Sequence, residues 1–268
     1  MHAGLAESLG DPAHLDQNTM TVAQVAIVAL AGLLAGSINA IVGAGSLITF
    51  PTLLAVGLPP VTANVTNTVG LVLGNVSAVV GYRWELRRQA SRAIQLSIPA
   101  LGGSVIGAAL LLLLPQRVFS YIVPALVAFA VVLVLLQPRI SKRLTSNSST
   151  RHWTNNIVPV GVFATAVYGG YFGAAQGVIL ISILTTLLPD PVQELNAVKN
   201  LLVGLTNLVA AVIFVAVAHV NWEAAAVVAV SSTVGGQVGS MVGRRMHPLV
   251  LRLVIVAAGA AALIKLLL

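Results

Sequence analysis

The sequence predicts an all-α membrane protein with several spanning segments, mainly because its composition is so apolar. Hydrophobic residues make up 57% of the 268 residues and charged residues 8%, whereas about 45–50% of a soluble domain is apolar. The run from Val22 to Val42 reaches the roughly 20 residues that a helix needs to cross the hydrocarbon core. No run alternates like a strand of an outer-membrane barrel, so helices are the expected spanning elements.

Ten hydrophobic segments follow one another along the chain, five in each half. The first five run over residues 20–42, 46–58, 61–82, 93–114 and 118–137, and the second five over 157–173, 177–188, 195–218, 222–243 and 248–268. A Gly-rich loop separates the first two segments of each half, and arginines follow the third and the ninth segments. The second segment of each half is too short to span comfortably, because about thirteen residues form only about 20 Å of helix.

Two polar stretches flank the predicted membrane regions. Residues 1–19 are acidic and lack a basic n-region, so they are predicted to be a disordered tail and not a cleaved signal peptide. Residues 138–156, rich in Ser, Thr, Asn and Arg, are predicted to be a flexible cytoplasmic linker. The linker separates a first membrane repeat, 20–137, from a second, 157–268.

The second half repeats polar and glycine positions of the first half. Asn64 and Asn75 recur 132 positions later as Asn196 and Asn207, and the same offset relates the pairs Gly103/Gly107 and Gly235/Gly239. Because five segments per half is an odd number, the second half must start on the opposite side of the membrane, and the repeats are expected to be inverted. Inverted repeats with short second segments are typical of secondary transporters, whose substrate lies between the halves.

The basic residues predict the orientation. Ten Lys or Arg lie in the loop after the third segment, in the linker and at the end of the ninth segment, whereas only Arg117 lies in a loop on the other side. The positive-inside rule therefore places the linker in the cytoplasm and the N-terminus outside, in the inner membrane. Because the basic residues are confined to short loops, the net charge of +7 does not indicate nucleic-acid binding.

The two Gly-rich loops are predicted to bind an anion. Asn39 to Ser46 precedes one short segment and Tyr168 to Gly177 precedes the other. Glycine permits a close approach of the backbone, and a helix that begins there directs free N–H groups at a ligand. The alternative is that the glycines only permit close helix packing. The candidate ligand-binding residues from the loops are Asn39, Gly43, Gly45, Ser46, Gly173 and Gln176.

The third segment of each half adds polar candidates, Asn64 and Asn67 in the first half and Lys199 and Asn200 in the second. Amide side chains inside a bilayer serve as interhelical bonds or as ligand donors. Lys199 has no acidic residue four positions away on either side, which favours an anionic ligand as its partner. The alternative is that Lys199 snorkels to the cytoplasmic surface.

Several functional classes are excluded. No Asp or Glu lies in the middle of a segment, so a carboxylate proton relay has no residues to use. The histidines lack the spacing of metal ligands, and there is no cysteine. We therefore expect no enzyme activity, no cofactor and no metal.

The run from Gly36 to Leu54, followed by Gly57 to Pro60 and Ala63 to Asn67, resembles the opening of the TauE/SafE family of sulfite exporters. The resemblance extends to residues 173–176 and 196–200, although Ala44 replaces one of the usual glycines. It implies export of sulfite, sulfoacetate or another organosulfonate.

Together these observations predict a transporter of small anions that works by alternating access in the lipid bilayer. The sequence leaves open which anion moves and whether the chain forms a homodimer. A membrane scaffold, in which the polar residues only hold helices together, is the alternative.

Overall fold

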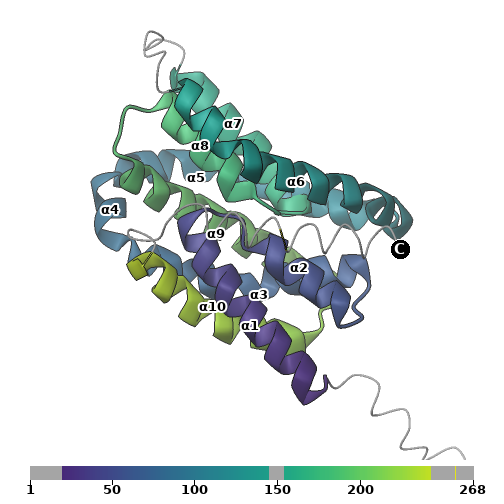
Figure 1. Cartoon of the computed structure of the whole chain (residues 1–268). Coiled ribbons are helices and arrows are strands. Elements are labelled where there is room, and N and C mark those ends of the chain that lie inside the picture. Colours follow the sequence, from purple (N-terminus) through teal and green to yellow (C-terminus); the bar gives the residue numbers. More distant parts are fainter. Residues whose placement is uncertain (1–19, 145–153, 243–256, 258–268) are drawn as a thin grey trace, which may run out of the picture.

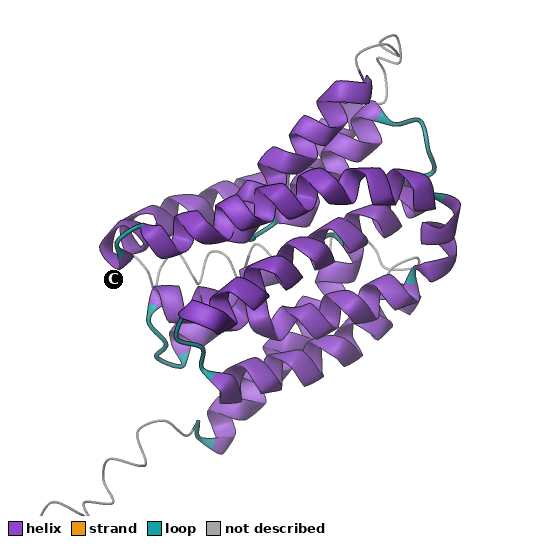
Figure 2. Cartoon of the chain, turned by 180° about the vertical axis from the view of Figure 1, so that it is seen from behind, coloured by secondary structure: helices purple, strands orange, loops and turns teal. Residues whose placement is uncertain are grey.

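The computed structural model describes residues 20–144, 154–242 and 257, and every regular element in these ranges is a helix (Figures 1 and 2). The helices are α1 (Val22–Ile41), α2 (Ser46–Ala55), α3 (Pro60–Gly81), α4 (Arg83–Arg88), α5 (Ala90–Leu113), α6 (Gln116–Leu144), α7 (Thr154–Tyr171), α8 (Gln176–Leu187), α9 (Val192–Val217) and α10 (Trp222–Val242). The predicted all-α class is confirmed. The predicted tail, 1–19, and most of the tenth segment, 248–268, lie outside the described residues.

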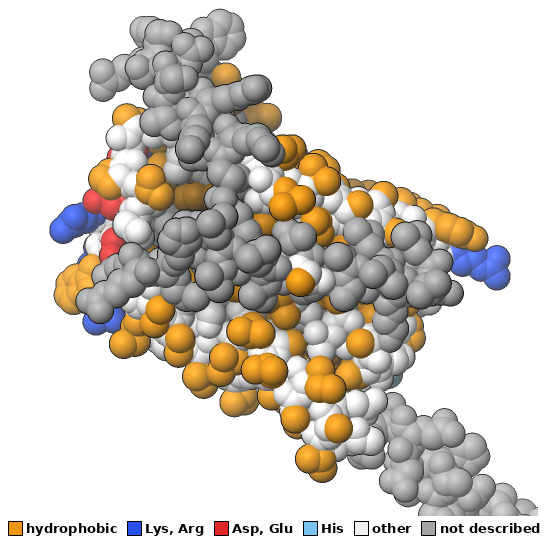
Figure 3. Space-filling model, viewed as in Figure 1, with side chains coloured by type: hydrophobic (Ala, Val, Ile, Leu, Met, Phe, Trp, Pro, Cys, Tyr) orange, Lys and Arg blue, Asp and Glu red, His pale blue; other side chains and the backbone are white. Residues whose placement is uncertain are grey.

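Six of the described helices are long and apolar enough to cross a membrane: α1, α3, α5, α6, α9 and α10. The predicted short segments are indeed short helices, since α2 has 10 residues and α8 has 12. Hydrophobic side chains are spread over the described part of the visible surface, and charged side chains lie near its two ends (Figure 3). This distribution is the one expected of a multi-pass membrane protein.

Small residues bring the long helices into close contact. A Cβ added at Gly36 on α1 would lie 2.2 Å from the carbonyl oxygen of Ser232 on α10, and one added at Gly74 on α3 would lie 2.6 Å from Ser232 Oγ. On the other side, a Cβ at Gly107 on α5 would lie 2.1 Å from the carbonyl oxygen of Val167 on α7. Close packing of this kind supplies van der Waals energy where lipid offers no hydrophobic driving force.

The two halves of the chain are interlocked. Helix α10 of the second half packs against α1 and α3 of the first half, and α5 of the first half packs against α7 and α9 of the second. Helices α3 and α9, which carry the predicted polar residues, also contact each other. Figure 1 shows α9 in the centre of the molecule, with α1, α3 and α10 on one side and α5, α7 and α8 on the other.

A charged cluster joins the halves at one end of the molecule. Arg92 pairs with Asp190, Arg88 Nη1 lies 3.5 Å from Glu194 Oε1, and Gln89 Nε2 donates to both acids at 3.0 and 2.7 Å. The sequence predicted a loop here and missed the helix α4.

Helices α6 and α7 reach into the predicted linker. Helix α6 continues to Leu144 and α7 begins at Thr154, whereas the linker was predicted over 138–156. Residues 145–153 lie outside the described ranges.

Candidate functional site

The two Gly-rich loops have the same backbone geometry. In the first, the N–H groups of Val42 and Gly43 donate to the carbonyl of Ile38 at 2.7 and 3.1 Å. In the second, the N–H groups of Phe172 and Gly173 donate to the carbonyl of Tyr168 at 2.9 and 3.2 Å. Both glycines are left-handed, with φ of 84° at Gly43 and 75° at Gly173. Such a glycine ends a helix without the steric cost that a side chain would bring.

The two loops touch each other. The N–H of Gly177, in the first turn of α8, donates to the carbonyl of Gly43 at 3.0 Å. A Cβ added at Gly177 would lie only 2.4 Å from the Cα of Gly43. The predicted loop residues of the two halves, far apart in sequence, are thereby brought to one place.

The start of α2 keeps unused donors. In the described part of the chain, the N–H groups of Ala44, Gly45 and Ser46 donate to no protein acceptor. Before α8, the N–H groups of Ala174 and Ala175 likewise donate to no described acceptor, but the N–H of Gln176 donates to the carbonyl of Gly173 at 3.2 Å. Free N–H groups and the positive end of the helix dipole suit an anion at α2.

Gly45 also has a packing role. A Cβ added there would lie 2.3 Å from the carbonyl oxygen of Ala35 on α1. The close packing weighed as the alternative is therefore real at this position, whatever its N–H binds. A substitution of Gly45 would disturb packing and ligand contacts together, so it cannot separate the two roles.

Lys199 is fully buried and does not snorkel. Its Nζ lies 3.1 Å from the carbonyl oxygen of Asn39 and 3.5 Å from that of Ala40, at the end of α1. The amides of Asn196 and Asn200 also donate to the Ala40 carbonyl, at 3.2 and 3.1 Å. A cation at a helix C-terminus is stabilising, because carbonyl groups there carry partial negative charge.

The remaining asparagines make interhelical bonds. Asn64 Nδ2 donates to the carbonyl of Tyr171, at the end of α7, at 3.0 Å. Asn67 Oδ1 accepts from the hydroxyl of Thr49 on α2. Asn39 Nδ2 donates to Oδ1 of Asn75, deep in α3. Neither Thr49 nor Asn75 was a predicted site residue, although the recurrence of Asn75 as Asn207 was the available signal.

Several buried polar atoms have no partner in the part of the chain that the structure describes. Both amide atoms of Gln176, a side chain only 1% exposed that packs over Gly169, lack a hydrogen bond. The others are Asn64 Oδ1, Asn75 Nδ2, Tyr171 Oη, Asn196 Oδ1 and Thr206 Oγ1. Unpartnered polar atoms are rare in protein interiors and call for an explanation such as a ligand, ion or water.

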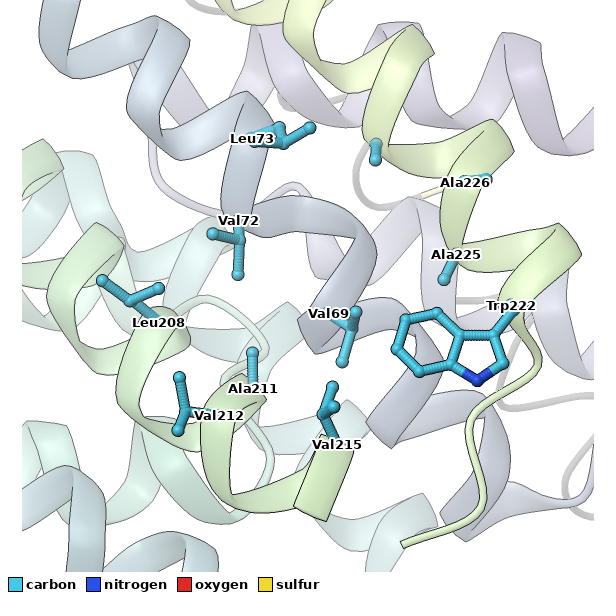
Figure 4. Close-up of a pocket in the computed structure, with 11 residues that line it drawn as sticks. Val69, Val72, Leu73, Leu208, Ala211, Val212, Val215, Trp222, Ala225 and Ala226 are labelled. Carbon is cyan, nitrogen blue, oxygen red and sulfur yellow. The ribbon is translucent and has the colours of Figure 1, made fainter.

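Two other kinds of binding site were considered, an apolar pocket and a metal site. An apolar groove of about 500 Å³ between α3, α9 and α10, with Trp222 at one end, is lined by aliphatic and aromatic side chains (Figure 4). The described residues hold no cluster of three His, Asp or Glu side chains that suits a metal ion. The candidate site is therefore the region of the touching loops and the adjoining ends of α1 and α7.

A sequence profile described as Sulfite exporter TauE/SafE matches residues 28–266. The chain belongs to this family. Its touching loops, buried lysine and paired asparagines are thus features of a TauE/SafE protein, and the family resemblance inferred from residues 36–67 is confirmed.

Curated relatives of this TauE/SafE chain are named as transporters. A probable membrane transporter protein, ORF9, of Sinorhizobium sp is 26% identical over 91% of this chain and 92% of its own length. The probable membrane transporter protein YfcA of Escherichia coli strain K12 is 27% identical over 88% of this chain and 86% of its own. No solved structure matches the chain. The chain is therefore a multi-pass membrane transporter.

Proposed function

We propose that this protein exports a small sulfur-containing anion, such as sulfite, sulfoacetate or another organosulfonate, across the inner membrane by alternating access. The observation that carries the proposal is a buried ammonium, Lys199, beside the loops that precede α2 and α8, with no described carboxylate bound to it. The free N–H groups of Gly45 and Ser46 support an anionic ligand. The family description adds the class of substrate.

Lys199 keeps donor capacity for a ligand. An ammonium has three N–H groups, and its two described acceptors lie at 3.1 and 3.5 Å. We propose that the anion takes the third N–H together with the amides at the start of α2. The amides of Gln176, Asn67 and Asn200 would complete the site, which Asn64 of the first half and Gly173 of the second half would line.

We also propose that the halves are inverted repeats. In the contacts of α1 with α10, of α3 with α10 and of α5 with α7, later residues of one helix meet later residues of the other. The two helices of each pair are therefore parallel. Since short connections make α3 antiparallel to α5, this favours opposite directions for the related helices α1 and α7. An inverted pair gives two similar packings about one central site, which is what alternating access needs.

The anion needs no coupled ion to leave the cell. An interior-negative membrane expels each negative charge with about 2.3 kcal/mol per 100 mV. Export of a monoanion or dianion is therefore downhill unless the outside concentration is very high.

Thermal shift and flux measurements test the proposal. The purified protein should be stabilised by one or more of sulfite, thiosulfate, sulfoacetate and sulfate over matched carboxylates, and proteoliposomes should release that ligand faster than protein-free liposomes. A scaffold predicts neither a ligand-dependent change in Tm nor any flux. If only carboxylates stabilise the protein, the class of substrate is wrong while transport can still stand.

The proposed orientation has its own test. Because the chain has no cysteine, single cysteines can be placed at Ser8 and Ser148 without background. An impermeant maleimide added to cells, with the outer membrane made permeable, should label Ser8→Cys and leave Ser148→Cys unlabelled until the inner membrane is opened. Labelling of Ser148→Cys in intact inner membranes would contradict the orientation.

A further inference from the structure

Helices α1 and α7 end in turns of the same geometry, but their last carbonyl groups have different partners. At the end of α1, the oxygens of Asn39 and Ala40 receive Lys199 Nζ. Counted back from the left-handed glycine of each loop, the corresponding oxygens of α7 belong to Gly169 and Gly170. Within the described ranges, no N–H or side chain donates to either of them. Both glycines are buried.

A third oxygen without a partner lies at the same helix end. Asn64 Nδ2 donates to the carbonyl of Tyr171 at 3.0 Å, which places the Asn64 amide at the end of α7. Asn64 is 1% exposed, and its Oδ1 accepts no hydrogen bond from the described residues. The end of α7 therefore gathers oxygen acceptors, and the Gln176 amide, which packs over Gly169, donates to none of them in the described ranges.

The repeat explains what is missing. The position related to Lys199 by the 132-residue offset is Asn67, whose Oδ1 accepts a hydrogen bond from Thr49. The end of α1 thus receives a lysine side chain, and the end of α7 receives none from these helices. A helix C-terminus carries roughly half a negative charge, and buried carbonyl groups without partners are costly.

We propose that the carbonyl oxygens of Gly169 and Gly170, with Asn64 Oδ1, bind a monovalent cation of the Na⁺ type. The cation would be the exchangeable equivalent of the Lys199 ammonium. Oxygen atoms at the ends of interrupted helices are known Na⁺ ligands in transporters. The ligands are neutral, which favours a single charge over a divalent ion. The proposed cation binding does not depend on the proposed anion transport. Only a coupling between cation and anion would depend on that transport.

Direct binding of ²²Na⁺ to the purified full-length protein tests the site, with no sulfur anion present. Wild-type protein should bind ²²Na⁺ saturably. Its Tm should rise by about 3–5 °C at ten times the dissociation constant, relative to N-methyl-D-glucamine chloride at equal ionic strength. Asn64→Ala should lower the affinity at least tenfold. Asn196→Ala, the matched change at the end that Lys199 already neutralises, should keep the Na⁺ response.

A second variant keeps the test decisive if Asn64→Ala does not fold. Asn67→Lys places an ammonium at the position related to Lys199, where it can bind the end of α7 as Lys199 binds the end of α1. The variant should therefore abolish ²²Na⁺ binding and make Tm independent of Na⁺. The proposal is overturned if wild-type protein shows no saturable ²²Na⁺ binding, in which case water fills the site. It is equally overturned if Na⁺ binding is unchanged in whichever variant folds. Neither outcome depends on which anion is carried, so failure of the anion proposal would be seen separately.

Discussion

Lys199→Met is expected to weaken binding of the anionic substrate about ten- to a hundred-fold. Methionine keeps the apolar stem but removes the ammonium, and a charge-assisted hydrogen bond contributes roughly 1.5–3 kcal/mol. Titration of the purified variant with the best ligand from the thermal-shift panel, at fixed pH and ionic strength, measures the effect. Lys199→Arg keeps the charge and should bind more tightly than Lys199→Met.

The same substitution also removes the cation that binds the end of α1, so stability must be separated from affinity. Loss of a charge at a helix C-terminus costs up to about 2 kcal/mol in a buried setting. Asn196→Ala removes a neutral donor from the same carbonyl, that of Ala40, and should lower Tm with little change in affinity. Wild-type affinity in Lys199→Met would show that Lys199 serves only to stabilise α1.

Gly177→Ala is expected to prevent correct folding of the protein. The added Cβ would lie 2.4 Å from the Cα of Gly43 and 2.9 Å from its carbonyl oxygen, which is backbone that cannot move aside cheaply. We expect destabilisation by about 3 kcal/mol or more, because overpacking here would separate the loops. Size-exclusion chromatography in detergent and the Tm of the purified protein measure the outcome.

Gly102→Ala is the matched control for this substitution. Its Cβ would lie 3.7 Å from Phe163 Cε2, an ordinary van der Waals contact, in the interior of α5. Alanine is the better helix former by up to about 1 kcal/mol, so Tm should stay the same or rise. A Gly177→Ala protein as stable as wild type would mean that the two loops do not touch in the membrane.

The sequence was sufficient for the helices but not for their contacts. Nine of the ten predicted segments correspond to described helices because apolar length is a local property, and the short α2 and α8 follow from the same property. The helix α4 was missed, since six residues with three arginines look like a loop. The partners of Lys199 could not be predicted, because they are backbone carbonyls that only the packing of α9 on α1 brings near.

The sequence also identified candidate site residues but not the contacts between them. Polar side chains in apolar segments stand out, so Asn39, Asn64 and Lys199 were identified from the sequence. The contact of Gly177 with Gly43 joins loops more than 130 positions apart, and no pattern in either loop indicates it. Which of these residues bind an anion stays a prediction.

The interlocked halves have a consequence for biogenesis. Helices α1 and α3 leave the ribosome more than 130 residues before α10, yet both pack closely on α10 through glycines. Until α10 is inserted, their small-residue faces are covered only by lipid, or by other chains with similar faces. The first half therefore cannot reach its native packing as an independent unit. Truncation after α6 should leave a fragment that the cell's membrane proteases recognise, and the final assembly step is the arrival of the second half.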